Sequence, residues 1–84
     1  MSDPRPEIRR VLRDHGRLPV DLDAVGDRDD LFLAGMTSHA SVSVMLALED
    51  AFDVEFPDDM LKRSVFATIA EISAAIGELQ AQAA

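Results

Sequence analysis

The chain has 84 residues, which is enough for one small domain over residues 1–84. Sixteen Asp and Glu against eight Lys and Arg give a formal net charge of −8, and there is no cysteine. Nucleic-acid binding needs clustered basic residues, so this charge argues against it. Without cysteine there is no disulfide, thiolate metal site or cysteine nucleophile. No apolar run approaches the roughly 20 residues of a membrane span and no signal peptide is visible, so we expect a soluble, cytoplasmic monomer.

The charge is unevenly distributed. Residues 21–61 contain eleven acidic residues and a single basic one, Arg28, whereas residues 1–17 carry a small positive excess. Such a negative field would attract a basic partner and accelerate its encounter. Acidic surfaces also simply keep small domains soluble, so the charge alone identifies no partner.

The first predicted helix begins near Pro4, with Asp3 as its cap, and ends at Gly16. A long connection over residues 17–37 follows, rich in acids and interrupted by proline and glycine. Its apolar residues predict that it is pinned to the core, and loops of this length in a compact domain are usually functional. Those apolar residues are Leu18, Val20, Leu22, Val25, Leu31, Phe32 and Leu33.

The second predicted helix runs over residues 38–52, and either Thr37 or Ser38 can cap it. Its apolar residues lie on two sides. The expected core-facing set is Val44, Met45, Leu48 and Phe52. Val42 and Leu46 lie four residues apart on a different side, next to Glu49 and Asp50. One helix of so small a domain cannot bury both faces, so we expect an exposed apolar strip there, unless another element covers it.

The rest of the chain predicts two further helices. Pro57 precedes a short one at about residues 58–63. Thr68 and Glu71 have the spacing of a capping box at the start of the last helix, whose end we expect to fray after Leu79. The predicted fold is an all-α, small four-helix bundle, with three long helices, one short helix and a long loop between the first two.

The side chains offer little chemistry of their own. Ser38 and His39 are adjacent, and neighbouring positions on a helix do not face each other, so they do not form a nucleophile–base pair. The run 21–26 faintly resembles the start of a calcium loop, but Val25 occupies the third ligand position and Phe32 stands in the place of the bidentate Glu. We therefore expect no metal site and no enzyme activity.

Ser38 is better placed to be modified than to act. It follows a glycine-containing loop and opens a helix, where free N–H groups and the dipole stabilise a phosphate by about 0.3–1 kcal/mol. Considered alone, Ser38 is more simply explained as a helix cap.

Three motifs give these residues a context. They are Gly-Met-Thr-Ser-His at 35–39, Leu-Glu-Asp-Ala-Phe at 48–52 and Phe-Pro-Asp-Asp at 56–59. Together they resemble the acyl carrier protein family, in which Gly-x-Asp-Ser-Leu starts the second helix, Leu-Glu-x-x-Phe closes it and Ile-Pro-Asp-Glu leads into the third. The resemblance covers about residues 30–76.

The resemblance implies that Ser38 carries a 4′-phosphopantetheine arm, transferred from coenzyme A by a phosphopantetheinyl transferase. The arm's thiol would hold cargo as a thioester, which agrees with a chain that lacks cysteine. The strip of Val42 and Leu46, with Glu49 and Asp50 beside it, would be the docking face for basic partner enzymes. Those enzymes would also read Thr37 and His39, the neighbours of the serine.

Thr37 and His39 stand where the family usually has Asp and Leu, a pattern that looks more like the stand-alone aminoacyl carrier proteins of bacteria. This resemblance implies a glycine or alanine cargo, loaded in trans by an amino acid:carrier protein ligase similar to class II aminoacyl-tRNA synthetases, or by another acyl-loading enzyme. A downstream acyltransferase would receive the cargo. The alternatives are a fatty acyl or polyketide carrier, and an acidic helical adaptor in which Ser38 is only a cap.

Overall fold

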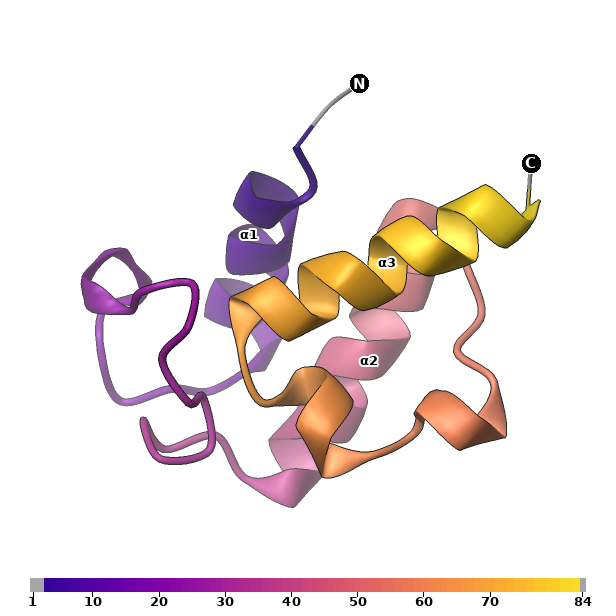
Figure 1. Cartoon of the computed structure of the whole chain (residues 1–84). Helices are drawn as coiled ribbons and strands as arrows, with labels where there is room; N and C mark the ends of the chain where they lie inside the picture. Colours follow the sequence, from indigo (N-terminus) through magenta and orange to yellow (C-terminus); the bar gives the residue numbers. More distant parts are fainter. Residues whose placement is uncertain (1–2, 84) are drawn as a thin grey trace.

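The computed structural model describes residues 3–83, which contain helices and short 3₁₀ turns but no strand (Figure 1). The α-helices are α1 (Arg5–His15), α2 (Ser38–Phe52) and α3 (Ile69–Ala83), and the 3₁₀ turns are η1 (Leu22–Ala24), η2 (Asp58–Met60) and η3 (Arg63–Phe66). The all-α prediction is confirmed. None of the helices within residues 3–83 is long and apolar enough to cross a membrane.

The prediction of a short helix at about residues 58–63 is wrong, and with it the count of four helices. That segment forms η2 and then the start of η3, because the backbone leaves the helical region between them. Leu61 has φ −85° and ψ 61°, and Lys62 is extended with φ −122° and ψ 147°. The result is a bundle of three α-helices with two short turns leading into the third.

The core lies where the three helices meet. The helix α1 packs against both α2 and α3, and in Figure 1 α3 passes in front of the other two. Each helix contributes side chains with no exposed surface. These are Ile8 and Leu12 from α1, Val44 and Leu48 from α2, and Ile69, Ile72 and Ile76 from α3.

The helix ends follow the predictions in part. The helix α1 starts at Arg5, one residue later than expected, and Pro4 occupies the cap position. The Asp3 carboxylate accepts from the Arg5 N–H at 3.0 Å and also from the Arg5 guanidinium. The Thr68 hydroxyl accepts from the Glu71 N–H at 3.0 Å, which is one of the two hydrogen bonds of the predicted capping box, and no return bond to the Glu71 carboxylate is present within residues 3–83. The predicted fraying after Leu79 is wrong, because α3 continues to Ala83 and Leu79 is itself buried.

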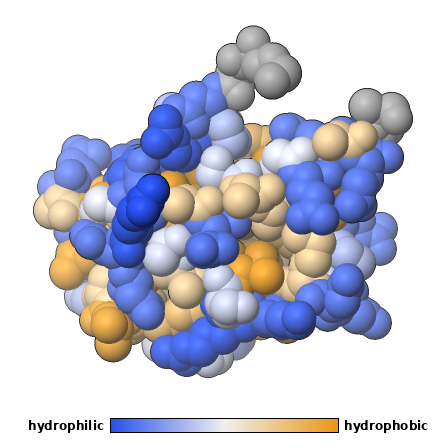
Figure 2. Space-filling model, viewed as in Figure 1, coloured by the Kyte–Doolittle hydropathy of each residue, from blue (hydrophilic) through white to orange (hydrophobic). Residues whose placement is uncertain are grey.

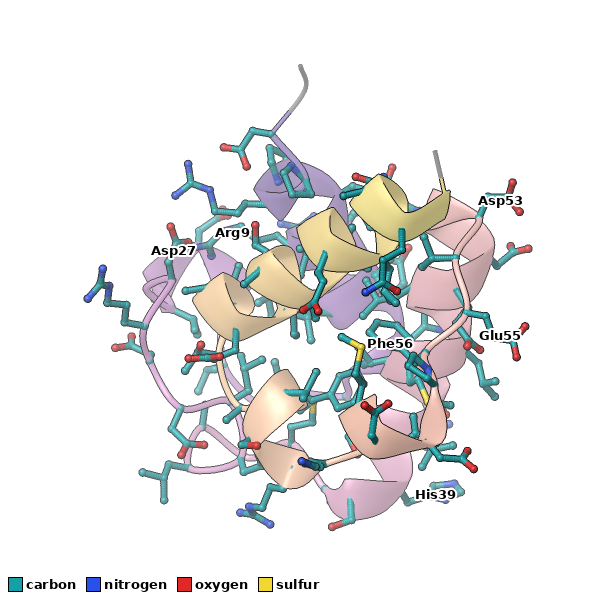
Figure 3. The ribbon with its side chains drawn as sticks, turned by 45° about the vertical axis from the view of Figure 1, so that its right-hand side comes forward. Arg9, Asp27, His39, Asp53, Glu55 and Phe56 are labelled. Carbon is teal, nitrogen blue, oxygen red and sulfur yellow. The ribbon has the colours of Figure 1, made fainter. Side chains whose placement is uncertain are left out.

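An arginine of α1 ties down the first half of the long loop. The Nη1 of Arg9 donates to the carbonyl oxygens of Leu22 and Val25, at 2.7 and 2.8 Å. Its Nη2 donates to Asp27 Oδ1 at 2.7 Å, and Arg5 Nη1 donates to Asp27 Oδ2 at 2.7 Å. Figure 3 shows Arg9 and Asp27 side by side. The loop therefore lies against α1 instead of extending into solvent.

The second half of the loop is bound to the start of α3. The Leu31 N–H donates to the Ala67 carbonyl at 2.7 Å, and the Ala70 N–H donates to the Asp27 carbonyl at 2.9 Å. The prediction that the loop is pinned to the core holds for Leu31 and for four of its other apolar residues, which are buried or half-buried. It is wrong for Val20 and Leu33, which are exposed.

A glycine turn brings the chain from this loop into α2. Gly35 has φ +123°, in the region that disfavours side chains, and a Cβ there would lie 2.6 Å from Pro19 Cδ. The following N–H, of Met36, donates to the Leu31 carbonyl at 3.0 Å, and Met36 is buried. This turn fixes where α2 begins.

We expect Arg9→Ala to lower the free energy of unfolding by about 1–3 kcal/mol, because two loop carbonyls lose their donor. Urea titration at neutral pH measures the loss. Arg13→Ala is the control, because Arg13 is exposed and its ion pair with Asp23 is long, at 3.6 Å. This substitution should change the free energy of unfolding by no more than about 0.5 kcal/mol.

The same variant should change the acid dependence of stability. Hydrogen bonds from Arg9 and Arg5 hold the pKa of Asp27 below its ordinary value. The contribution of Asp27 to stability is therefore fully present above the pKa of about 4 that it has in the unfolded chain. This contribution is lost as the pH falls through its lower pKa in the folded protein. The difference in the free energy of unfolding between the parent protein and Arg9→Ala should become smaller from pH 7 to pH 3. A difference that stays constant would contradict this role of Asp27.

Gly35→Ala should destabilise the fold by about 1–3 kcal/mol, because alanine is strained at this φ and its methyl group meets Pro19. Gly77→Ala is the matched control. Gly77 is exposed inside α3, and a methyl group added there would meet no other atom within 4 Å, so alanine should stabilise by about 0.5–1 kcal/mol. Thermal unfolding of both variants measures the contrast, and equal melting temperatures would contradict the strain argument.

Candidate functional site

The first residue of α2 is Ser38, and the cap of this helix is its neighbour. Thr37 is extended, with φ −81° and ψ 162°, and its Oγ1 accepts a hydrogen bond from the Ala40 N–H at 3.0 Å. The sequence allowed either residue to cap, and the structure assigns the cap to Thr37. The hydroxyl of Ser38 therefore has no part in capping the N-terminus of the helix.

Ser38 is exposed and available. Its side-chain oxygen makes no hydrogen bond with any residue in the range 3–83, while its carbonyl accepts from Ser41 Oγ at 2.6 Å. The N–H groups of Ser38 and His39 also lack partners within that range, as expected for the first turn of a helix. An anionic group on this hydroxyl would lie at the positive end of the helix dipole.

His39 does not act on its neighbour. Figure 3 shows its side chain pointing away from α2 into solvent, and no hydrogen bond joins it to Ser38. Successive helical positions differ by about 100° around the axis, which explains the divergence. The pair is not an activated nucleophile.

Three acidic side chains of the long loop accept hydrogen bonds from backbone N–H groups of the same loop. Asp21 Oδ1 accepts from the Asp23 N–H at 3.0 Å, and Asp29 Oδ2 accepts from the Gly26 N–H at 2.8 Å. Asp30 Oδ1 similarly accepts from Phe32 and the residue after it. Among residues 3–83 no group of three or more His, Cys, Asp or Glu side chains could hold a metal ion.

The two faces of α2 are separated as predicted. Val44 and Leu48 are fully buried, whereas Val42 and Leu46 are 52% and 56% exposed. Ser38, Val42 and Leu46 follow one another at four-residue spacing, so the hydroxyl and the two apolar side chains share one face of the helix. We call Val42 and Leu46 the apolar strip.

The acids beside the strip have different roles. Asp50 is exposed, but Glu49 is half-buried and its Oε2 accepts from the Phe56 N–H at 2.9 Å, which holds the chain after α2 in place. Figure 3 shows Asp53 and Glu55 along the same edge of the molecule as His39. These two exposed acids were not predicted, although Asp53 follows Glu49 at the same four-residue spacing.

A shallow groove lies on the other side of Ser38, between α2 and the chain around η3. Its volume is about 460 Å³. Its walls are Phe32, Ser38, Ser41, Val42, Met45, Leu61, Lys62, Arg63 and Phe66. The guanidinium carbon of Arg63 lies 4.0 Å from the centre of the Phe32 ring. Sequence reasoning missed this groove, because it depends on how η3 packs.

Most of the face seen in Figure 2 is hydrophilic, with apolar patches at the lower left, where the long loop leads towards α2. Within the part of the chain that the structure describes, the exposed large apolar side chains come from this loop, from α2 and from the chain before η3. They are Val20, Leu33, Val42, Leu46 and Leu61.

Known proteins are similar to this chain in both sequence and structure. A family described as a phosphopantetheine attachment site matches residues 8–76. An aminoacyl carrier protein from Agrobacterium fabrum (strain C58) is 49% identical over 65 residues, which are 77% of this chain and 78% of that protein.

Two solved structures agree with it. One is a chain in the crystal structure of an engineered Bradyrhizobium japonicum glycine:[carrier protein] ligase, complexed with carrier protein from Agrobacterium tumefaciens and ATP. It superposes with a TM-score of 0.86 at 43% identity, covering 88% of this chain and 96% of that one. The other is an Agrobacterium tumefaciens protein studied in solution, with a TM-score of 0.75 at 41% identity, covering 95% and 99%. The chain belongs to the phosphopantetheine-binding acyl carrier protein family.

Proposed function

We propose that Ser38 is the residue that bears the 4′-phosphopantetheine of this family. The observation that carries the proposal is the division of labour between two neighbours: Thr37 caps α2, and Ser38 is left exposed with a free hydroxyl. On transfer, Ser38 Oγ bonds to the phosphorus that bears pantetheine, the bond to the 3′,5′-ADP portion of coenzyme A breaks, and the transferase accepts the hydroxyl proton. The chain has no cysteine, so this arm supplies its thiol.

We infer that the cargo is a small amino acid, glycine or alanine, held as a thioester. The support is the 49% identity to an aminoacyl carrier protein and the likeness to a chain from a complex with a glycine:[carrier protein] ligase. The protein is then a substrate and not an enzyme. A ligase would activate the amino acid with ATP and transfer it to the thiol, and a downstream acyltransferase would remove it.

The docking face in this proposal is the apolar strip with the acids beside it. Val42 and Leu46 are half exposed on the face that also carries Ser38, so an enzyme bound there is close to the attachment point. Asp50, Asp53 and Glu55 add exposed negative charge along the same side. Apolar contact supplies affinity, whereas the acids steer a basic partner and set the salt dependence.

The two alternatives differ in what they expect of Ser38 and of the core. The adaptor alternative assumes that Ser38 serves only as the cap of α2, and the observation that Thr37 is the cap argues against it. A fatty acyl or polyketide carrier shares the arm but must accommodate a long chain. Long acyl cargo would then raise the melting temperature, while a small charged amino acid would leave it nearly unchanged.

Incubation with coenzyme A and a phosphopantetheinyl transferase should add the mass of one phosphopantetheine to the parent protein and none to Ser38→Ala. Intact mass spectrometry measures both. Ser38→Ala should keep its stability to within about 0.5 kcal/mol, since the removed hydroxyl is exposed and unbonded. Ser41→Ala, in the same turn of α2, is the control and should be modified normally.

The modified protein should then accept radiolabelled glycine or alanine from a ligase and ATP, in a form released by hydroxylamine. A modified Ser38→Ala, or an unmodified Ser41→Ala alongside a modified parent, would contradict the assignment of the serine. Label that resists hydroxylamine would exclude the thioester.

Val42→Asp and Leu46→Asp should each lower kcat/KM for loading about tenfold or more, because each removes an apolar contact worth about 1.5–3 kcal/mol when buried. Initial loading rates at several carrier concentrations measure the effect. Val20→Asp is the matched control, since Val20 is 43% exposed but lies in the long loop. Unchanged rates in both strip variants would place the interface elsewhere.

A further inference from the structure

Two cations line the groove beside Ser38. Lys62 and Arg63 form one wall of it, together with Leu61 and Phe66, while Ser38 and Met45 belong to the opposite wall on α2. Both cationic side chains are exposed, and neither forms an ion pair with a carboxylate of residues 3–83.

Their place in the sequence makes them unusual. Lys62 and Arg63 are the only Lys or Arg residues after Arg28, and they follow a stretch of eleven acids that starts at Asp21. In a domain with a net charge of −8, the two basic residues of the C-terminal half both face the groove that holds the serine. An anion attached to Ser38 would therefore share this groove with two positive side-chain charges.

Arg63 is already oriented for such a contact. Its guanidinium lies over the Phe32 ring with the carbon 4.0 Å from the ring centre, an arrangement that restricts the side chain and leaves its N–H groups free. A planar guanidinium with several donors matches the oxygens of a phosphate better than any other side chain. Lys62 adds a second, more mobile positive charge.

We propose that Lys62 and Arg63 hold the phosphodiester of the arm on Ser38 and direct the arm along this groove. The inference rests on the proposed attachment at Ser38. The occupant is then the protein's own prosthetic group, whose anionic end meets the two cations and whose apolar pantoyl portion lies against Met45 and Phe66. Both cationic residues act as positioning residues.

This course of the arm leaves part of the docking face open. Met45 and Leu46 are successive residues of α2, so their side chains diverge by about 100° around the helix axis. An arm along Met45 rests on the groove side, whereas Leu46 stays exposed for a partner. Val42 belongs both to the apolar strip and to the groove wall, so an arm in the groove would lie beside Val42 and leave Leu46 as the part of the strip open to a partner.

The test uses isotope-labelled full-length protein carrying an unlabelled arm, with attachment first established by intact mass. Nuclear Overhauser contacts between the pantoyl methyl protons and the Met45 methyl group report the arm in the groove. The Arg63 Nε–H resonance should shift between the forms without and with the arm. In Lys62→Gln/Arg63→Gln, two lost surface ion pairs should lower the ratio of groove-bound to free arm about 2- to 30-fold.

Arg17→Gln/Arg28→Gln is the matched control, because it removes the same charge from exposed residues that do not line the groove. It should keep the contacts, and added salt should weaken them in the parent protein. Absent contacts in the parent, or contacts unchanged in the Lys62/Arg63 double variant, would overturn the cationic clamp while leaving attachment intact. A parent protein that gains no mass would instead overturn the attachment at Ser38, and this inference with it.

Discussion

The structure depends on a constraint imposed by size: α2 is apolar on two sides, and an 84-residue domain has core enough for only one of them. Val44 and Leu48 have no exposed surface in the core, where α2 packs against α1, and this fixes the rotation of the helix about its axis. Once that rotation is set, Val42 and Leu46 must face solvent. The exposed strip is therefore a consequence of how the core is built, and Ser38, four residues before Val42, is carried to the same face.

In the proposed function, the N-terminus of α2 separates two tasks, capping the helix and bearing the arm, that one hydroxyl could not perform together. A helix needs a side chain to accept from its first free N–H groups, and a modified serine could not do this reliably while bearing a bulky group. Thr37 accepts from the Ala40 N–H, and Gly35 provides the turn that places Thr37 in its extended conformation before the helix. Replacing the usual acid of the family by threonine thus keeps the cap and removes one negative charge next to the serine.

Sequence reasoning succeeded where the signal is periodic and local. The α2 boundaries, the buried and exposed sides of α2 and the start of α3 follow from apolar spacing and caps. It failed at residues 58–63, where the chain forms two 3₁₀ turns instead of one helix, and at the C-terminus, where α3 continues to Ala83. The hydrogen bonds from Arg9 to the long loop could not be predicted either, because two of them go to backbone carbonyls 13 and 16 positions away, which carry no sequence signal.

The site shows the same division between local and long-range information. Ser38 and the strip lie on one helix, so their geometry could be predicted from spacing alone. The groove combines three segments, Phe32 from the long loop, Met45 from α2 and Arg63 from η3, and only the folded chain brings the guanidinium over the ring. The long loop thus contributes to the site as well as to the core: its contacts with α1 and α3 place Phe32 under Arg63, which in turn faces the groove beside the serine. A domain too small to enclose an active site can still orient a covalently attached group, provided that a charge and an apolar wall lie within reach of the attachment point.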